Sequence, residues 1–149
     1  MTTEPVVPPS PLPIGWKEYV ALPEWGVRRL RAKIDTGACT SALGVAGCEV
    51  EETPAGPVAL LRLALNRLRP ERVRLVRAPV VRFAIVRNSG GAAERRPVVE
   101  VLARVGPVEK RIRLTVTSRA GMRCRMLLGR EALRDDFVVD VRRKYVYPV

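Results

Sequence analysis

Apolar and polar residues alternate along most of this chain, which is the pattern of β-strands with one buried face. Over residues 27–34, Leu30, Ala32 and Ile34 alternate with arginine and lysine, so one face of this strand should be buried. The same reasoning predicts strands over residues 15–22, 42–51, 69–86, 98–105, 110–117, 126–128 and 137–146.

Turn residues separate these segments at 23–26, 53–56, 88–91 and 106–107. Residues 58–65 are apolar almost throughout and fit either a helix or a strand, and the turns on both sides favour a strand. Residues 130–134 fit one or two helical turns. The chain also lacks a repeat of about 20 to 50 residues, so it is predicted to be all-β with one short C-terminal helix.

The length of 149 residues fits one domain. Residues 1–13 contain five prolines and are predicted to form a flexible arm, which leaves residues 14–149 as the domain. The N-terminus lacks a basic segment followed by an apolar one, and no apolar run reaches about 18 residues. Three cysteines, an odd number, suit a reducing compartment. The protein is therefore expected to be cytoplasmic, with no membrane partner.

The chain has no histidine, which excludes a Ser-His-Asp triad and a Cys-His dyad. Cys39, Cys48 and Cys124 lack paired spacing, and no glycine-rich loop with a lysine is present for ATP. No metal or cofactor is therefore expected. Any catalysis must come from carboxylates, hydroxyls, lysine or a lone thiol.

The net charge is +12, from 27 basic and 15 acidic residues, and favours a polyanionic partner, either nucleic acid or an acidic protein segment. An arginine-rich composition also fits a GC-rich genome. Seven aromatic residues are few for binding single-stranded nucleic acid. Residues 60–130 carry 18 basic and four acidic residues, which are either a solvated face or a wall that binds polyanions.

The strongest candidate for chemistry is Asp35-Thr36-Gly37-Ala38, directly after the strand at 27–34. The strand would fix the position of the carboxylate, and Gly37 would allow a sharp turn. An ordinary turn also favours these residues. Far downstream, Met126-Leu127-Leu128-Gly129-Arg130 forms an apolar strand that ends in glycine before a helix.

This combination resembles the retropepsin-like aspartic proteases, in which a glycine-rich flap lies between the two motifs, as residues 88–91 do here. The chain is most similar to a bacterial branch with Ile14-Gly15-Trp16-Lys17-Glu18, Asp35 to Leu43 and Met126 to Arg130. That branch includes the RimB-type proteases. It is associated with RimK, a ligase that adds glutamates to the tail of a ribosomal protein. It is often labelled as ATP-dependent zinc proteases, a label for which this sequence shows no site.

The resemblance implies a closed, barrel-like fold with one lobe per chain, and a homodimer that joins two Asp35 carboxylates. It implies a catalytic role for Asp35, Thr36 and Gly37, and a supporting role for Gly129 and Arg130. Substrate contacts are implied for Ala38, Arg87, Asn88, Ser89, Gly90 and Gly91. The expected substrate is an acidic, glutamate-rich segment. The alternatives are a protease of broad specificity and a non-catalytic basic module that binds RNA or a ribosomal surface.

Other polar residues are interpreted as structural. Cys39 stands where relatives tend to have a basic residue, and it is expected to be a buried thiol. Asp135, Asp136 and Asp140 are expected to cap the short helix and to carry surface charge, although a carboxylate pair is the alternative. The remaining acidic residues considered are expected to lie on a solvated strand face, and they are Glu49, Glu51 and Glu52.

Overall fold

The computed structural model describes residues 10–66, 68–69, 71–87, 90–118 and 124–148. The helical elements in this part are η1 (Pro23–Trp25), a 3-10 turn, and α1 (Arg130–Leu133). The strands are β1 (Leu12–Gly15), β2 (Lys17–Leu22), β3 (Val27–Ile34), β4 (Ser41–Gly44), β5 (Gly47–Thr53), β6 (Gly56–Ala64), β7 (Val73–Arg87), β8 (Ala93–Val105), β9 (Val108–Thr117), β10 (Met126–Leu128) and β11 (Phe137–Asp140).

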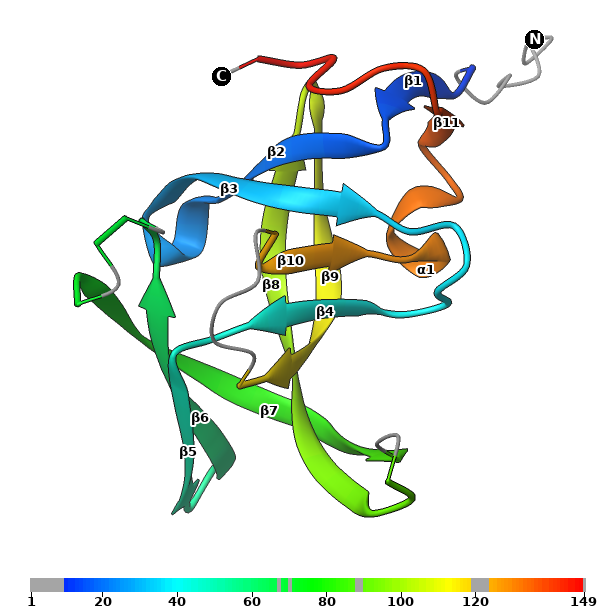
Figure 1. Cartoon of the computed structure of the whole chain (residues 1–149). Helices are drawn as coiled ribbons and strands as arrows, with labels where there is room; N and C mark the ends of the chain where they lie inside the picture. Colours follow the sequence, from blue (N-terminus) through cyan, green and yellow to red (C-terminus); the bar gives the residue numbers. More distant parts are fainter. Residues whose placement is uncertain (1–9, 67, 70, 88–89, 119–123, 149) are drawn as a thin grey trace, which may run out of the picture.

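Six strands close a barrel in the order β2, β3, β10, β4, β9 and β8, since Ala21 of β2 pairs with Arg104 of β8. The long strand β8 serves two neighbours: its first half pairs with β7 and its second half with β9. The antiparallel strands β7, β6 and β5 thus continue the sheet away from the barrel (Figure 1). The prediction of an all-β, closed barrel with one short helix is confirmed.

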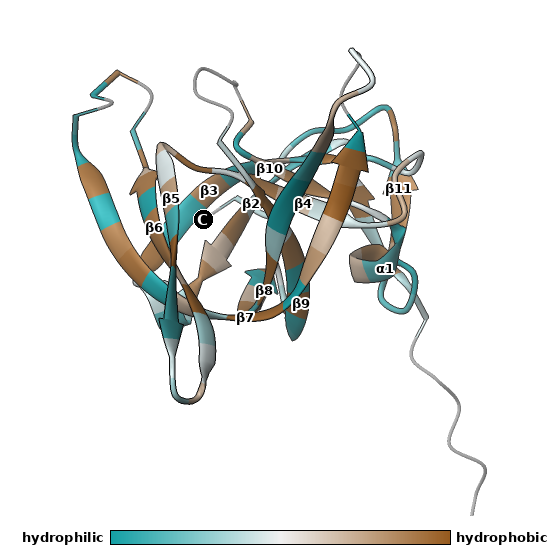
Figure 2. Ribbon diagram, turned by 90° about the horizontal axis from the view of Figure 1, so that it is seen from below, coloured by the Kyte–Doolittle hydropathy of each residue, from teal (hydrophilic) through white to brown (hydrophobic). Residues whose placement is uncertain are grey.

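The barrel is filled by the inward side chains of alternating strands. Leu30, Ala32 and Ile34 are buried as predicted, and Leu114 and Met126 are fully enclosed. Figure 2 shows how apolar and polar positions alternate along the strands. None of the helices in the described part of the chain is long and apolar enough to cross a membrane.

The short strand β10 lies between β3 and β4 (Figure 1), parallel to the first and antiparallel to the second. Met126 pairs with Ala32 on one side and with Leu43 on the other. Residues 35–40, which connect β3 to β4, therefore pass round the end of β10 where α1 begins. The topology brings together the two motifs that stand far apart in the sequence.

The strand predicted over 42–51 is instead two strands, β4 in the barrel and β5 at the far edge of the sheet. The chain changes partners between them: the N–H of Val45 donates to Thr117 and that of Ala46 donates to Arg62. Gly47 has no room for a Cβ beside the guanidinium of Arg62. Both halves alternate well, so the pattern could not reveal the exchange of partners.

The first and last strands of the described chain differ from the predicted segments. The strand predicted over 137–146 ends at Asp140, and Tyr145 has a φ of 51°, which is incompatible with a strand. At the other end, β1 begins at Leu12, inside the predicted arm, and pairs in parallel with β11. Residues 1–9 lie outside the described residues, so the arm itself stays a prediction.

Candidate active site

Asp35 follows the last residue of β3 and is half-buried. Its N–H donates to the carbonyl of Leu128 at 2.9 Å, which fixes the backbone from β10. Its carboxylate oxygen Oδ1 accepts the N–H of Gly37 at 2.9 Å. A Cβ at Gly37 would lie 3.2 Å from this oxygen, so glycine allows the amide to approach the acid. The carboxylate is thereby oriented at the end of a rigid strand.

Arg130 supports the loop from the start of α1. Its Nη1 donates to the carbonyl of Thr36 at 2.9 Å, and its backbone N–H donates to the carbonyl of Ala38 at 2.8 Å. Ala38 is half-buried, whereas Thr36 and Gly37 are exposed. The Thr36–Gly37 edge of the loop is therefore open to solvent, while its inner side is fastened to α1.

Gly129 is the point at which the loop and β10 pack most closely. Its N–H donates to the buried hydroxyl of Ser41 at 3.0 Å. A Cβ at this position would collide with the backbone of Thr40 and would lie 2.8 Å from the carbonyl oxygen of Ala38. Only glycine fits here, so the structure gives a steric reason for the Gly-Arg pair after the apolar strand.

The predicted flap lies on the connection between β7 and β8, which reaches the same side of the molecule as the β3–β4 loop in Figure 1. Arg87 is the exposed last residue of β7, and Gly90 and Gly91 follow in the connection. Asn88 and Ser89 lie outside the described residues. The flap role and the substrate contacts of these residues stay predictions.

The prediction that Cys39 is a buried thiol is wrong. Cys39 is exposed on the β3–β4 loop, where its Sγ lies 3.7 Å from Oε1 of Glu131. The prediction failed because the loop wraps round the outside of β10 rather than through the core. Among the described residues, the polar partner of the Cys39 thiol is therefore the carboxylate of Glu131 on α1.

The acidic residues after α1 form surface ion pairs. Asp136 pairs with Lys110 at 2.7 Å, and Asp140 pairs with Arg142 at 3.1 Å. The Arg142 side chain, together with its backbone N–H, lowers the pKa of Asp140. The predicted helix cap is wrong, because Gly129 is the N-cap residue of α1 and these aspartates follow the helix. The exposed positions predicted for Glu49, Glu51 and Glu52 are confirmed.

Several basic residues of the 60–130 segment are paired with acids of η1, β5, β8 and β9. Arg104 meets Glu109 at 2.7 Å, and Arg111 meets Glu24 at 3.1 Å. The hydrogen bond from Arg111 lowers the pKa of Glu24, with help from the N–H of Leu102. Further pairs join Arg62 to Glu49, Arg77 to Glu51 and Arg96 to Glu94. This segment is therefore partly neutralised rather than a uniform basic wall.

Glu18 is a buried carboxylate to which the sequence analysis assigned no role. It is fully enclosed and accepts the N–H groups of Gly15 at 2.7 Å, Val146 at 3.0 Å and Tyr147 at 3.3 Å. It therefore fastens the C-terminal segment to the start of β2. The burial of Glu18 could have been predicted from the sequence, because Glu18 lies two residues before Val20 and therefore on the same inward face of β2.

Within the described residues, no group of three or more histidine, cysteine, aspartate or glutamate side chains is placed to hold a metal ion. The loop instead offers one oriented carboxylate beside an exposed backbone. Such an arrangement can activate water if a second carboxylate comes close.

The closed barrel, with an Asp-Thr-Gly loop held against an apolar strand that ends in Gly-Arg, is a retropepsin-like fold. The sequence model of the RimB-like family, described as retropepsin-like aspartic endopeptidase RimB, matches residues 13–148, and the chain belongs to this family. The fold is also similar to a crystal structure from Legionella pneumophila of a protein with unknown function, with a TM-score of 0.76 and 23% identity over 92% of this chain and 98% of that one.

Curated relatives carry a different name. A protein from Desulfotalea psychrophila called "Probable alpha-L-glutamate ligase" is 32% identical over 85% of this chain, which spans 27% of that relative. A protein from Shewanella pealeana with the same name is 31% identical over 85% of this chain and 28% of the relative. This chain thus spans little more than a quarter of the length of these relatives.

Proposed function

We propose that the chain is an aspartic endopeptidase whose active site is completed when two copies bring their Asp35 carboxylates together. The observation that carries this proposal is the β3–β4 loop, which presents one oriented carboxylate on an open edge of the barrel. The chain contains a single Asp-Thr-Gly sequence, so a dyad requires a second chain. A two-fold interface places the same residue from each copy at the axis.

The reaction is the hydrolysis of a peptide bond. Two close carboxylates share one proton, since both cannot readily be ionised together. The ionised Asp35 takes a proton from water as the water oxygen bonds to the scissile carbonyl carbon. The protonated Asp35 donates its proton to the carbonyl oxygen. When the C–N bond breaks, the proton held by the first carboxylate passes to the amine nitrogen, and a hydroxyl of the tetrahedral intermediate returns its proton to the second carboxylate. The products are a free acid and a free amine, and the dyad again holds one proton.

The proposed substrate is an acidic, glutamate-rich segment. The net charge of +12 favours a polyanionic substrate. Two curated relatives contain this segment within much longer chains named as glutamate ligases. A domain that belongs to the same chain as a glutamate ligase is suited to act on glutamate-containing substrates. A separate association with a RimK-type ligase is part of this proposal.

The test is the substitution Asp35→Asn, which keeps the size and the hydrogen-bond acceptor for Gly37 but removes the acid. Cleavage of a glutamate-tailed peptide, followed by mass spectrometry, should fall by at least about a thousandfold, because the general base is lost. The sedimentation coefficient should not change. Asp135→Asn, at a surface position after α1, is the matched control and should cleave normally. Wild-type rates in the Asp35 variant would refute the mechanism.

A further inference from the structure

The outer face of β3 carries a row of cations that leads to Asp35. Leu30, Ala32 and Ile34 point into the barrel, and the alternate residues Arg29, Arg31 and Lys33 are exposed. Because side chains alternate along a strand, Asp35 continues the outward series at the end of β3. We call Arg29, Arg31 and Lys33 the β3 track.

The charges of the β3 track are not neutralised by ion pairs with the acids that the structure describes. Across the described residues, no ion pair includes Arg29, Arg31 or Lys33, in contrast to the paired arginines of β8 and β9. Arg29 instead stacks its guanidinium over the ring of Tyr19 at 4.6 Å. The β3 track therefore keeps its attraction for an external anion.

A cleft of about 510 Å³ lies at the end of the track remote from Asp35. Arg29, Arg31 and Arg125 bring three guanidinium groups to its lining. The opposite wall is the connection between β6 and β7, where the side chain of Asn66 accepts the N–H of Leu68 at 2.9 Å. This hydrogen bond joins two of the residues that line the wall.

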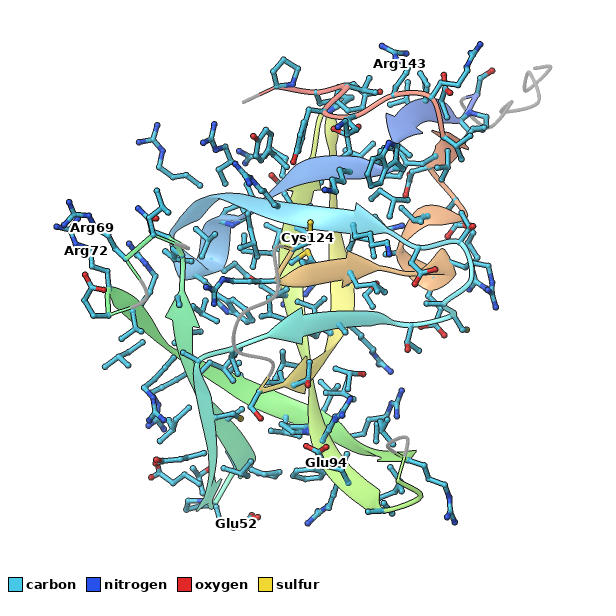
Figure 3. All side chains as sticks on the ribbon, in the orientation of Figure 1. Glu52, Arg69, Arg72, Glu94, Cys124 and Arg143 are labelled. Atoms are coloured by element: carbon cyan, nitrogen blue, oxygen red, sulfur yellow. The ribbon has the colours of Figure 1, made fainter. Side chains whose placement is uncertain are left out.

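The described residues of the β6–β7 connection include the exposed Arg69, Glu71 and Arg72, so this connection adds a net positive charge near the start of β3. Figure 3 shows Arg69 and Arg72 projecting from it, whereas Glu52 and Glu94 lie at the other end of the sheet in this view. An anion that approaches the cleft thus meets cations from two separate segments.

The aromatic side chains beside the cleft favour carboxylates over nucleic-acid bases. The rings of Tyr19 and Tyr145 stack on each other with centroids 4.4 Å apart, and Arg29 covers Tyr19. These rings therefore offer little free surface on which a base could stack, and such stacking supplies much of the affinity for single-stranded nucleic acid. A guanidinium binds a carboxylate through two parallel hydrogen bonds without needing an aromatic platform.

The spacing of the β3 track fits an extended peptide. Alternate residues of a strand lie about 6.6 Å apart, which is also the separation of alternate side chains in an extended substrate. Arg29 lies six positions before Asp35, so the track and the acid together span about 20 Å, or about six residues of an extended chain. Every second glutamate of such a chain would meet a cation.

We propose that the β3 track and its cleft form an extended subsite that binds the carboxylates of a glutamate-rich segment on one side of the scissile bond. This inference rests on the proposed endopeptidase function for the position of the bond. The binding itself depends only on the unpaired cations and the cleft.

The test measures binding separately from cleavage. Fluorescein-labelled oligoglutamates of two, four, six and eight residues are titrated with the full chain carrying Asp35→Asn, and anisotropy gives Kd. Affinity should rise with length and level off near six residues, when the track is filled. Adding Arg29→Gln and Arg31→Gln should weaken binding of the octamer about tenfold or more, because two charge-assisted contacts are lost.

The matched control adds Arg28→Gln and Arg82→Gln, which remove the same charge from exposed positions outside the track. This control should change Kd less than about twofold if position rather than net charge matters. Arg31→Lys, which keeps the charge but not the planar fork, should bind with intermediate affinity. Thermal melts of each variant report whether the fold is intact.

The outcomes separate this inference from the proposed function. Equal weakening by the two double substitutions, or none, would overturn the subsite even if the wild-type chain cleaves the octamer. Arginine-dependent binding without cleavage by the wild-type chain would support the subsite and refute the peptidase. Tighter binding of an octauridylate with the same dependence on Arg29 and Arg31 would overturn the assignment to a peptide.

Discussion

At the scale of single residues, Glu18 makes a contribution to stability that can be measured. Glu18 is fully buried, and its two oxygens accept three backbone N–H groups in buried or half-buried hydrogen bonds. Glu18→Gln replaces one oxygen with an NH₂ group, which cannot accept, so at least one of these donors loses its partner. Urea unfolding should show a loss of about 1–3 kcal/mol.

The control for Glu18 is Glu109→Gln, which removes a carboxylate from a solvent-exposed pair with Arg104. Surface ion pairs contribute little, so this loss should be several times smaller. If the two substitutions cost the same, Glu18 does not fasten the C-terminal segment in the way that its hydrogen bonds indicate.

The sequence predicted a candidate acid but not all that surrounds it. Asp35 stands out because it directly follows an alternating strand, and Gly129 because it directly follows an apolar one, and both are local patterns. The exposure of Cys39 could not be predicted, since it depends on how the loop passes round β10. The bond from Arg130 to Thr36 joins residues 94 positions apart, and only the resemblance to a family indicated a supporting role.

At the scale of elements, strand identity was easier to predict than strand pairing. Alternation correctly placed β3 and β9, because one buried face leaves a period of two, whereas the flanking turns favoured a strand at β6. Alternation predicted a single strand where the structure has β4 and β5, since a change of pairing partner leaves the alternation intact. It also extended β11 too far. The segment after Asp140 makes isolated hydrogen bonds to Trp16, Lys17 and Glu18, and the φ of 51° at Tyr145 prevents a continuous strand.

The β7–β8 connection allows a matched test of the flap. Gly91 has a φ of +83°, and Gly56, in the β5–β6 turn, has a φ of +116°; a Cβ at either position would meet open space. Alanine should strain both turns by about 1–2 kcal/mol. Only Gly91→Ala should lower kcat/KM, by about tenfold, if this connection closes over the substrate.

Steady-state kinetics on the two glycine variants, with thermal melts alongside, make this comparison. A similar fall in kcat/KM for both variants would mean that general destabilisation, not the flap, controls activity. An unchanged kcat/KM for Gly91→Ala would show that the β7–β8 connection takes no part in the active site.

At the scale of the whole molecule, the positive charge of the chain and its single Asp-Thr-Gly loop bear on the same proposed activity. The net charge is +12, yet ion pairs occupy several arginines of β7, β8 and β9. The cations of β3 remain available beside the loop that carries Asp35. The proposed long-range attraction for acidic chains and the carboxylate proposed to act on them would therefore lie along the same strand.

Because each chain would supply one Asp35 to the proposed dyad, mixing wild-type chains with Asp35→Asn chains should lower the activity. If each active site needs Asp35 from both copies, a dimer with one Asp35→Asn chain is inactive. After subunit exchange at equal concentrations, about a quarter of the dimers should contain two wild-type chains. Activity per wild-type chain should therefore fall to about half, and dilution of the wild type below the dimer Kd should abolish it. Activity that stays proportional to the wild-type concentration, with no dependence on added variant or on dilution, would show that a single chain carries the whole site.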